Sequence, residues 1–448
     1  MAKPKKNKTP LKMEKLMSLC KRRGFIFLSS EIYGGVGSTF DYGPYGAPMK
    51  NNIARLWWNE MTLRHDNIVG IDSAVILHPK VWEASGHLEE FNDPMVDCRE
   101  CKGRFKADDV LRDQDGAFVC PRCGSRDSFT ETRQFNLMFK TGIGAVSSED
   151  SIAYFRPETC QGIFLDYKTV QETARLKVPF GIAQIGKAFR NEITTGNFIF
   201  RTREFEQMEM EFFVKPGETS EWLNYWREQR WNWYLSLGVD SEKLRWSQHP
   251  QDKLAHYARE AWDIEYRFPF GWGEIEGIHD RTDYDLKAHQ ELSGKDLTYF
   301  DDRTRERFIP HIVETSAGLN RTMLMLLCDA YREDVQAGER RVYLALDPKV
   351  APIKAAILPL VKKDGLMEIG KTIADHLRGK WQVFFDEQGS IGRRYRRMDE
   401  IGTPFAFTID YQTKEDGTVT VRWRDTLEQE RINKDRIDEY LIDNLKGL

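Results

Sequence analysis

Two short segments near the middle of the chain combine charged and aromatic residues in a pattern suited to nucleotide binding. They are Phe189-Arg190-Asn191-Glu192 and, eleven residues further on, Arg203-Glu204-Phe205-Glu206-Gln207-Met208-Glu209. We interpret them as two strands joined by a loop, so that alternate side chains share a face. Arg190 and Glu192 then share one face of the first strand. On the second strand, one face carries Phe205, Gln207, Glu209 and Glu211, and the other carries Met208, Met210 and Phe212.

The predicted hairpin therefore has two chemically different faces. Its apolar face can pack on helices. Its polar face offers a guanidinium, an aromatic ring and several carboxylates, which together can hold a triphosphate, a base and an ammonium.

Two further stretches supply groups of matching chemistry: Arg156-Pro157-Glu158-Thr159 and Glu314-Thr315-Ser316-Ala317-Gly318-Leu319-Asn320-Arg321. In the second stretch, Glu314 and Ser316 share a strand face, and Arg321 begins a helix after a turn of small residues. Such an arginine can reach a phosphate, and the glycine lets a nucleotide approach the backbone. A single arginine most often forms a surface ion pair, but the three stretches together favour a binding site.

Four of the seven cysteines are paired in the sequence. Cys98 and Cys101 form one C-x-x-C pair, and Cys120 and Cys123 form another, with eighteen residues between the pairs. Four thiolates at this spacing predict a structural zinc site with no open position for a catalytic water. A vestigial ribbon and a redox pair are the alternatives.

The overall composition limits the class of protein. A length of 448 residues predicts two or three domains, and 40% hydrophobic with 30% charged residues is typical of a soluble globular protein. Because no apolar run approaches the roughly 20 residues of a membrane helix, we expect no membrane partner. The lysine-rich segment 1–8 has no apolar stretch behind it, which favours a solvated tail over a secretory signal. Seven cysteines in this pattern indicate a reducing compartment, and we expect a cytoplasmic protein.

The rest of the chain supplies elements that must position these groups. Apolar periodicity predicts helices over 11–23, 47–64, 219–237 and 319–331, and strands over 74–77, 264–268, 273–278 and 308–315. Trp222, Trp226 and Trp233 fall on one side of the helix over 219–237, which we interpret as core packing rather than a ligand platform. Beyond a composition break near 337–340, strands and helices are expected to alternate over 342–346, 351–361, 368–377 and 381–385, as in an α/β domain.

Several of these segments carry a family resemblance. Phe189-Arg190-Asn191-Glu192 with Arg203-Glu204-Phe205 resembles motif 2 of class II aminoacyl-tRNA synthetases, and Gly318-Leu319-Asn320-Arg321 resembles motif 3. The helix from Ala47 and the strand to Pro79 sit where motif 1 would. The segments that resemble the homodimeric type of glycyl-tRNA synthetase are Tyr42-Gly43-Pro44-Tyr45-Gly46, Trp82-Glu83-Ala84-Ser85-Gly86-His87, Arg156-Pro157-Glu158-Thr159 and Gly389-Ser390-Ile391-Gly392-Arg393-Arg394-Tyr395.

The resemblance extends from residue 11 to about residue 445 and implies an α+β fold. It implies a class II antiparallel sheet flanked by helices, a zinc-ribbon-like insertion and a C-terminal α/β anticodon-binding domain. We expect the catalytic domain to begin over 1–95, the insertion to span 96–150, the catalytic core with motifs 2 and 3 to span 151–338 and the anticodon-binding domain to span 341–448. The chain departs from the family at Cys160, where alanine is expected, and at Trp423, where a charged residue is usual.

The implied reaction is the activation of glycine with ATP to glycyl-adenylate and its transfer to the 3′ end of tRNA(Gly), with AMP and pyrophosphate as products. The implied catalytic residues are Arg190 on the α-phosphate, Arg321 on the base or γ-phosphate, and Glu274 on ATP and Mg²⁺. Phe205 would stack on the adenine and Glu192 would contact its edge. The remaining implied ATP residues are Asn191, Phe200, Arg201, Arg203, Ile275, Gly318, Leu319 and Asn320.

Glycine has no side chain, so its pocket must recognise the ammonium and carboxylate and exclude anything larger. Glu158, Glu209 and Glu314, with Ser316, come from separate segments and are expected to converge on the ammonium. Three clustered carboxylates repel one another, so the empty pocket should be strained or partly protonated. The implied glycine set is completed by Arg99, Phe205, Gln207, Arg281 and Gly318.

Arg393-Arg394-Tyr395-Arg396-Arg397 interleaves an aromatic residue with arginines. Such a run suits phosphate contacts and base stacking on single-stranded RNA, and a solvated charged loop is the alternative. At a net charge of −4, tRNA must be held by local patches of this kind. The resemblance also implies a homodimer.

Three other hypotheses compete with a glycine-specific synthetase. A synthetase for another small amino acid is disfavoured by Glu158, Glu209 and Ser316 together. A noncatalytic nucleic-acid-binding relative should have lost its motif arginines and glutamates, which are present here. A bare zinc-ribbon module leaves most of the chain unexplained.

Overall fold

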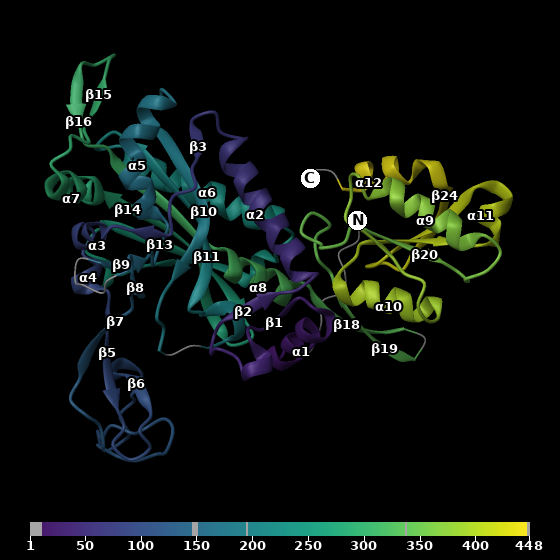
Figure 1. Ribbon diagram of the computed structural model, residues 1–448, viewed down its shortest axis with the longest axis horizontal. Helices are drawn as coiled ribbons and strands as arrows, with labels where there is room; N and C mark the ends of the chain where they lie inside the picture. Colours follow the sequence, from purple (N-terminus) through teal and green to yellow (C-terminus); the bar gives the residue numbers. More distant parts are fainter. Residues whose placement is uncertain (1–10, 146–150, 194–195, 337, 446–448) are drawn as a thin grey trace.

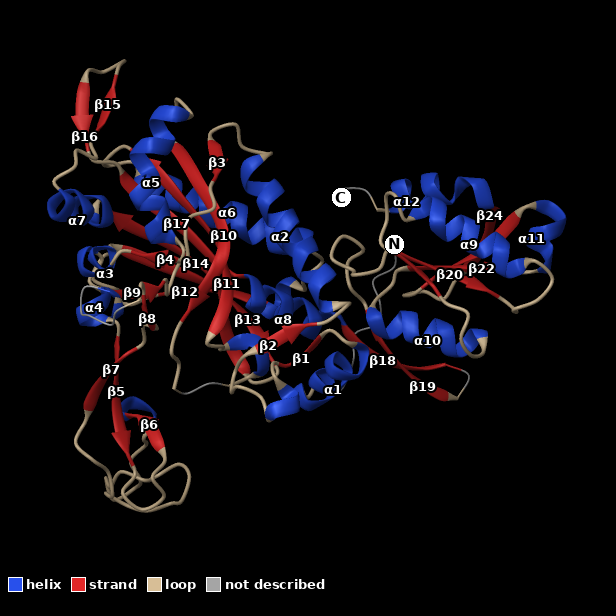
Figure 2. Ribbon diagram, viewed as in Figure 1, coloured by secondary structure: helices blue, strands red, loops and turns tan. Residues whose placement is uncertain are grey.

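A computed structural model describes residues 11–145, 151–193, 196–336 and 338–445. The predicted lysine-rich tail 1–8 lies outside the described residues. The chain forms a larger lobe with two projections and a smaller C-terminal lobe (Figure 1). The helices and strands of both lobes are mixed, as the predicted α+β class requires (Figure 2).

A seven-stranded sheet forms the centre of the larger lobe. All neighbouring strands pair antiparallel except β10 and β3, which are parallel. This confirms the predicted antiparallel sheet. Its strands, in spatial order, are β12 (Leu244–Gln248), β13 (Glu260–Phe268), β14 (Gly271–Thr282), β17 (His311–Gly318), β11 (Glu204–Val214), β10 (Phe180–Phe189) and β3 (Ile68–Gly70).

The two faces of β11 separate the apolar core from the polar groups. Met208, Met210 and Phe212 are buried in the main hydrophobic core, as the period-two pattern predicts. That core lies between the sheet and helices α1 (Met13–Arg23), α2 (Gly46–Thr62), α6 (Thr219–Ser236) and α8 (Leu319–Ala330). Trp226 and Trp233 are buried there and Trp222 packs against them, which confirms a core role for the tryptophans.

The opposite face of the sheet is covered in part by two other helices, α5 (Cys160–Thr173) and α7 (Tyr284–Ser293). Phe213 on β11 packs against Tyr167 on α5, with ring centroids 4.7 Å apart. The polar residues of β11 lie on this face. A second hydrophobic core, between the sheet and helices α5 and α7, therefore covers the part of this face that carries no polar groups.

An arm projects from the larger lobe (Figure 1). It is a three-stranded sheet of β5 (Asn92–Asp97), β6 (Arg104–Lys106) and β7 (Arg133–Asn136), with long turns at its tip. At its base lie α3 (Pro79–Ala84), α4 (His87–Glu90) and a sheet of β4 (Ile76–Leu77), β9 (Ile152–Phe155) and β8 (Lys140–Gly142). Two hairpins complete the lobe, β1 (Ile26–Leu28) with β2 (Phe40–Tyr42) and β15 (Tyr299–Asp301) with β16 (Glu306–Phe308).

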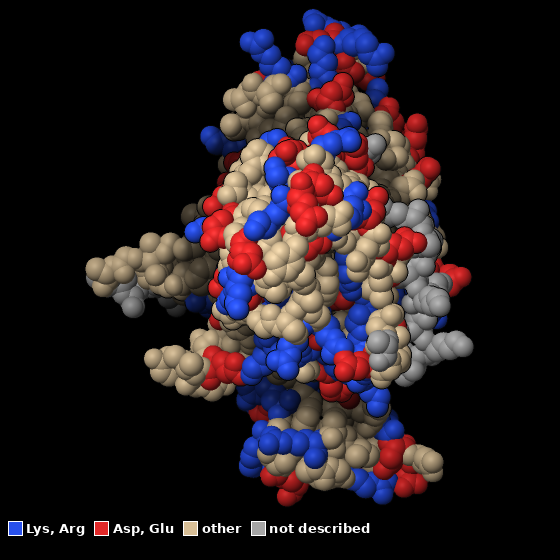
Figure 3. Space-filling model, turned by 90° about the vertical axis from the view of Figure 1, so that its right-hand side faces the viewer, with Lys and Arg blue, Asp and Glu red and all other residues tan. Residues whose placement is uncertain are grey.

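The smaller lobe is an α/β domain joined to the larger by the hairpin of β18 (Tyr331–Gln336) and β19 (Glu339–Leu344). Its sheet has the order β21 (Val383–Phe385), β20 (Ala355–Pro359), β22 (Phe405–Ile409), β23 (Thr418–Trp423) and β24 (Gln429–Asn433). Helices α9 (Leu366–Leu377), α10 (Ile391–Ile401), α11 (Tyr411–Asp416) and α12 (Ile437–Asn444) connect and cover it. Basic and acidic side chains are interspersed over the side of the molecule that this lobe presents (Figure 3).

Three local predictions are wrong. Residues 190–192 lie beyond the end of β10 rather than in a strand. The small residues Ser316, Ala317 and Gly318 continue β17 instead of forming a turn. Residues 339–344 pair with β18, so the α/β alternation starts only with strand β20, inside the segment 351–361.

Among the described residues, none of the helices combines the length and the apolar character needed to cross a membrane.

Candidate active site

A pocket of about 180 Å³ opens on the polar face of the central sheet. Its walls come from β11, β14 and β17, from the start of α8 and from the loop between β10 and β11. The pocket brings together residues that lie up to 163 positions apart in the chain, from Glu158 to Arg321. It is lined by Glu158, Arg190, Glu192, Ile199, Phe200, Arg201, Thr202, Phe205, Glu206, Gln207, Glu209, Tyr257, Glu274, Gly277, His279, Glu314, Ser316, Gly318, Asn320 and Arg321.

Arg190 is held rigidly at one end of the pocket. Its Nε donates to the carbonyl of Pro157 at 3.0 Å. Its guanidinium faces the ring of Phe205, 5.4 Å from the centroid, and the ring of Phe91, 5.3 Å from the centroid. An arginine fixed in this way can meet a phosphate without first losing side-chain freedom.

Arg321 lies at the same end of the pocket, because it belongs to the first turn of α8. Its Nε donates to the carbonyl of Phe200 at 3.1 Å, and its guanidinium lies 4.5 Å from the centroid of that ring. It also pairs with the half-exposed carboxylate of Glu274 at 3.1 Å. Arg201 is exposed and lies 3.9 Å from Glu192. This end of the pocket thus offers two fixed cations, two aromatic rings and carboxylates, which matches a nucleoside triphosphate with its divalent cation.

The other end of the pocket is built around Glu209, which is 1% exposed. One of its oxygens accepts from Ser316 Oγ at 2.6 Å and from Gln207 Nε2 at 2.9 Å. The other oxygen accepts from the backbone N–H of Thr159 at 2.9 Å and from the hydroxyl of the same residue. Because four donors surround it, the carboxylate has one orientation.

Thr159 is available to Glu209 because the preceding turn is anchored to β10. Arg156 is buried, and it donates to the carbonyl of Lys187 at 2.7 Å and to that of Ser73 at 3.0 Å. Gly186 leaves room for this guanidinium, since a Cβ there would lie 2.1 Å from one of its nitrogens. The turn therefore delivers both Glu158 and the start of α5 to the pocket.

The clustered carboxylates differ in how their charge is balanced. Burial, with the nearby Glu314 and Glu158, raises the pKa of Glu209 to about 7. Burial also opposes ionisation of Glu158, but His87 and Arg281 hold the pKa of its carboxyl well below the usual range. The empty pocket therefore keeps Glu158 ionised and Glu209 partly protonated at neutral pH, which agrees with the expected mutual repulsion.

Glu314 is held between two cations. Its Oε2 lies 2.7 Å from His279 Nδ1, and its Oε1 accepts from Arg281 at 3.1 Å. Despite burial, these two groups lower the pKa of Glu314. His279 also faces Asp263, and despite burial the two carboxylates raise the pKa of His279 to about 9. The arrangement fixes Glu314 as an anion at the pocket wall.

The structure brings most of the predicted residues to this pocket, but not all of them. Arg281 is fully buried behind Glu314, where it also pairs with Asp285 at 2.8 Å. Arg203 donates to the carbonyls of Glu192 and Gly37, so it ties two loops together outside the pocket lining. Asn191, Ile275 and Leu319 also lie outside the lining, and the last two are buried in the core.

Arg99, a predicted glycine-binding residue, lies in the arm and outside the pocket lining. It is exposed, and its Nε donates to the carbonyl of Phe129 within the arm. The arm projects away from the central sheet (Figure 1). The structure therefore does not bring Arg99 to the other glycine-pocket residues.

Besides His87, which contacts Glu158, the sequence did not predict six residues of the lining: Ile199, Thr202, Glu206, Tyr257, Gly277 and His279. A signal for His279 existed, because it alternates with Gly277 along β14 and stands opposite Glu314 in the sheet register. His87 closes a segment that resembles the family, but nothing in its spacing indicates a contact with Glu158. Tyr257 lies in a loop without a pattern.

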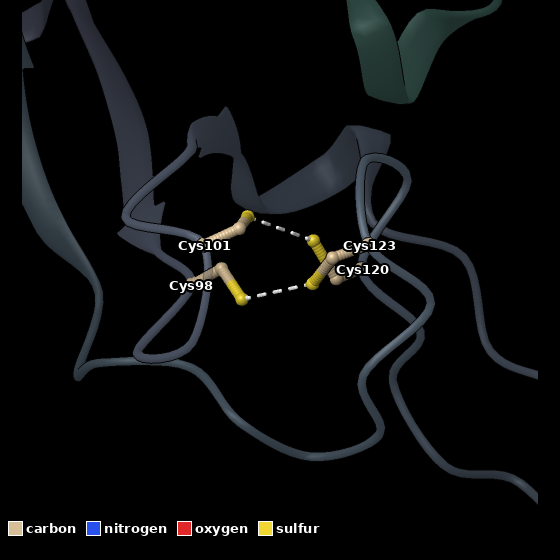
Figure 4. A group of neighbouring side chains, drawn as sticks. All are labelled: Cys98, Cys101, Cys120 and Cys123. Atoms are coloured by element: carbon tan, nitrogen blue, oxygen red, sulfur yellow. Dashed lines mark hydrogen bonds between the residues drawn. The ribbon is translucent and has the colours of Figure 1, made fainter.

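The four paired cysteines converge at the tip of the arm (Figure 4). Cys98 Sγ lies 3.7 Å from Cys123 Sγ, Cys101 Sγ lies 3.7 Å from Cys120 Sγ, and all four sulfurs lie within 4.8 Å of one another. Tetrahedral zinc with Zn–S bonds of about 2.3 Å requires sulfurs about 3.8 Å apart. The donor set and its spacing therefore fit a structural zinc ion, and the sulfurs are too far apart for disulfides.

The arginine run 393–397 does not form the predicted RNA surface as a whole. It lies on α10, and Arg394 is 3% exposed, with its guanidinium donating to the carbonyls of Pro359, Leu360 and Asp386. Tyr395 packs against the main core and hydrogen-bonds to Thr408. Only Arg393 and Arg396 are exposed. The prediction is wrong for Arg394 and Tyr395. The run lies on an amphipathic helix, and these two side chains are on the helix face that packs against the protein.

Comparisons with known proteins agree with this geometry. Residues 144–330 match the tRNA synthetase class II core domain (G, H, P, S and T), and residues 354–444 match the anticodon binding domain. The chain is 56% identical over 443 residues to the glycine–tRNA ligase of Treponema denticola, covering 98% of each chain. It is 52% identical to that of Thermobifida fusca, covering 97% of this chain and 98% of the relative, and 53% identical to that of Chlorobaculum tepidum, covering 97% and 100%.

Proposed function

Because the chain belongs to the glycine–tRNA ligase family of class II tRNA synthetases, we propose that the pocket on the central sheet condenses glycine with ATP and then charges tRNA(Gly). Class II synthetases use ATP. The observation that carries the proposal is one small pocket with Arg190 and Phe205 at one end and Glu158, Glu209 and Glu314 at the other. Adenylate formation joins the carboxylate of the amino acid to the α-phosphate of ATP. It therefore requires a nucleotide site and an amino-acid site next to each other.

In the proposed first step, the glycine carboxylate attacks the α-phosphorus in line and pyrophosphate leaves. Arg190 stabilises the charge that develops on the α-phosphate, while Arg321 holds the far end of the nucleotide. Phe205 stacks on the adenine and Glu192 meets its edge. No protein nucleophile is required, because positioning and charge neutralisation supply the catalysis. In the second step the terminal hydroxyl of the tRNA attacks the activated carbonyl, the bond to the phosphate breaks and AMP leaves.

The proposed glycine specificity follows from what fills the end of the pocket. Glu158, Glu209 and Glu314 place negative charge around the ammonium, and Ser316 closes the wall beside Glu209. The four donors on Glu209 prevent it from moving aside for a side chain. Steric exclusion of this kind discriminates more strongly than apolar contact, which is worth only about 1–3 kcal/mol per methylene.

Two metal ions complete the proposal. Glu274 is a half-exposed carboxylate at the nucleotide end, and such hard oxygen ligands suit Mg²⁺ with a triphosphate. Mg²⁺ would neutralise phosphate charge there. Zinc held by Cys98, Cys101, Cys120 and Cys123 would stabilise the arm without taking part in the reaction.

We also propose a homodimer in the cytoplasm. None of the seven cysteines, all of which lie in the described part of the chain, forms a disulfide, which supports a reducing compartment. Ile32 and Tyr33 are each 88% exposed, and an apolar pair of this kind supports burial against a second chain. A mass of twice 52.3 kDa by light scattering would support the dimer, and a mass of 52.3 kDa would refute it.

The decisive experiment is ATP–pyrophosphate exchange with glycine, alanine or serine as the amino acid. Exchange with glycine alone is expected. Equal exchange with alanine or serine would refute glycine specificity, and no exchange with any of them would favour a noncatalytic nucleic-acid-binding protein.

A further inference from the structure

The four-residue helix α4 (His87–Glu90) lies at the base of the arm, and the residues at its two ends contact residues that line the pocket. His87 begins the helix and faces Glu158. Phe91 follows the helix and faces Arg190. The segment Trp82 to His87 resembles the family, yet the proposed reaction gives it no role.

The ring of His87 has one fixed orientation. Its Nδ1 lies 2.8 Å from Ser85 Oγ, and it packs against the rings of Trp82 and Phe91, with centroids 5.5 and 5.3 Å away. Its Nε2 therefore points to Glu158 Oε2, at 3.4 Å. The ring and the carboxylate are each 11% exposed, so little water competes for the contact.

Glu158 depends on His87 because its other oxygen is already occupied. Oε1 accepts from Cys160 Sγ at 3.0 Å and from Gln161 Nε2 at 3.1 Å. Those two donors fix one oxygen, and His87 fixes the other. Without His87, the carboxylate can rotate about its last bond and lose its direction toward the glycine ammonium.

Phe91 holds Arg190 in place, as His87 holds Glu158. The guanidinium has an aromatic ring on each side, Phe91 at 5.3 Å and Phe205 at 5.4 Å. If Phe205 stacks on the adenine as proposed, Phe91 is the ring that remains to hold the guanidinium. A cation against an aromatic face is stabilised by the ring's quadrupole, and more strongly when the cation is desolvated.

The backbone around α4 fixes both side chains together. Leu137 N–H donates to the carbonyl of Phe91 at 3.1 Å, and the carbonyl of Leu137 accepts from Asn191 N–H at 2.7 Å. Asn136 Nδ2 donates to the carbonyl of His87 at 3.1 Å. The two strands that enter and leave the arm thus connect α4 directly to the residue after Arg190.

We propose that His87 and Phe91 are positioning residues, with His87 directing Glu158 toward glycine and Phe91 directing Arg190 toward the α-phosphate of ATP. This inference rests on the proposed function and adds to it. Neither residue contacts a substrate. Each acts through a residue that does, and the two act on different substrates.

The test is ATP–pyrophosphate exchange with separate titrations of glycine and ATP. His87→Leu should raise the KM for glycine about tenfold or more, since the imidazole contact that orients the Glu158 carboxylate is lost, and should leave the KM for ATP within twofold. His87→Gln should recover most of the loss, because its amide can donate from the position of Nε2. His256→Leu is the matched control, because His256 contacts α4 through Glu90 at 2.7 Å and is not among the residues that line the pocket.

Phe91→Leu should act mainly on the nucleotide, lowering kcat/KM for ATP about 3- to 30-fold. Because the ring also packs against His87, the KM for glycine should change as well, but by a smaller factor. Phe91→Tyr keeps the ring and should behave as the wild type. Phe155→Leu is the control, because its ring packs on Phe189, 5.2 Å away, one residue before Arg190.

The kinetic split decides the outcome. A glycine KM in His87→Leu equal to that of the wild type, or His87→Gln no better than His87→Leu, would overturn the role of His87. A loss in Phe91→Leu shared equally by glycine and ATP would overturn the role of Phe91. A wild-type chain without glycine-dependent exchange would instead refute the proposed function.

Discussion

Replacing Glu209 by glutamine tests the amino-acid end of the pocket most directly. The two side chains have the same shape, so the change removes charge and leaves the volume of the pocket intact. Gln207 Oε1 has no hydrogen-bond partner among the described residues, so the amide of Gln207 can rotate and accept from the new NH₂ group. The Ser316 hydroxyl can accept as well. The variant should therefore keep its fold.

The expected loss falls on glycine. A hydrogen bond to a charged group contributes about 1.5–3 kcal/mol, which corresponds to roughly a tenfold to hundredfold rise in the KM for glycine. The KM for ATP should not change, because Arg190, Phe205 and Arg321 are untouched. Glu204→Gln is the matched control, since Glu204 is on the same strand, half exposed and paired with Lys187 outside the pocket.

The pH dependence gives a second measure of the same change. The pKa of Glu209 is raised to about 7, and only the ionised carboxylate attracts an ammonium. In the wild type, the KM for glycine should therefore rise as pH falls from 8 to 6, and in Glu209→Gln this dependence should be weaker. A carboxyl whose folded pKa is raised stabilises the fold at low pH and loses that contribution as pH rises through about 7, so the variant should be at least as stable as the wild type at pH 8.

The assay is ATP–pyrophosphate exchange over a range of glycine at saturating ATP, with thermal unfolding at pH 8 measured alongside. A KM for glycine within twofold of the wild type would refute the pocket assignment. So would an equal rise in the KM values for glycine and ATP, because it would mean that Glu209 supports the whole sheet face rather than one substrate.

Three further predictions concern the supports of the site. Cys120→Ser should lose its zinc, whereas the wild type and the control Cys20→Ala should keep theirs, as measured by atomic absorption. Wild-type protein that carries no zinc when purified under reducing conditions would contradict the metal assignment. Arg394→Met leaves three buried carbonyls without their donor and should lower tRNA charging and the unfolding temperature of the C-terminal lobe, whereas the exposed Arg393→Met should not lower that temperature; equal stability of the two variants would contradict a structural role. Arg281→Met removes the cation shared by two buried carboxylates and should lower the free energy of unfolding by about 3–5 kcal/mol in urea, and a change below about 1 kcal/mol would show that the network tolerates its loss.

The sequence by itself determined which face of β11 is apolar and which cysteines group together, because periodicity and spacing are local properties. Alternation along β11 separates Met208 and Met210 from Glu209, and the structure confirms both faces. The two C-x-x-C pairs predict four converging thiols, which also converge. Even where the strand prediction failed at 190–192, the side chains Arg190 and Glu192 still line the pocket, and Arg190 N–H still donates to the carbonyl of Arg203 at 2.9 Å.

Tertiary structure alone decided which of those residues meet and what charge they carry. Glu314 is an anion because Arg281 and His279 flank it, whereas Glu209 has a raised pKa because burial and two neighbouring carboxylates outweigh its donors. Such differences depend on distances between strands, which no single stretch of sequence contains. For the same reason Arg99, suited by type to a substrate, lies in the arm, and Arg394, suited by type to RNA, is buried on the inner face of α10. Side-chain chemistry follows from the residue, but its charge state and its partners follow from packing.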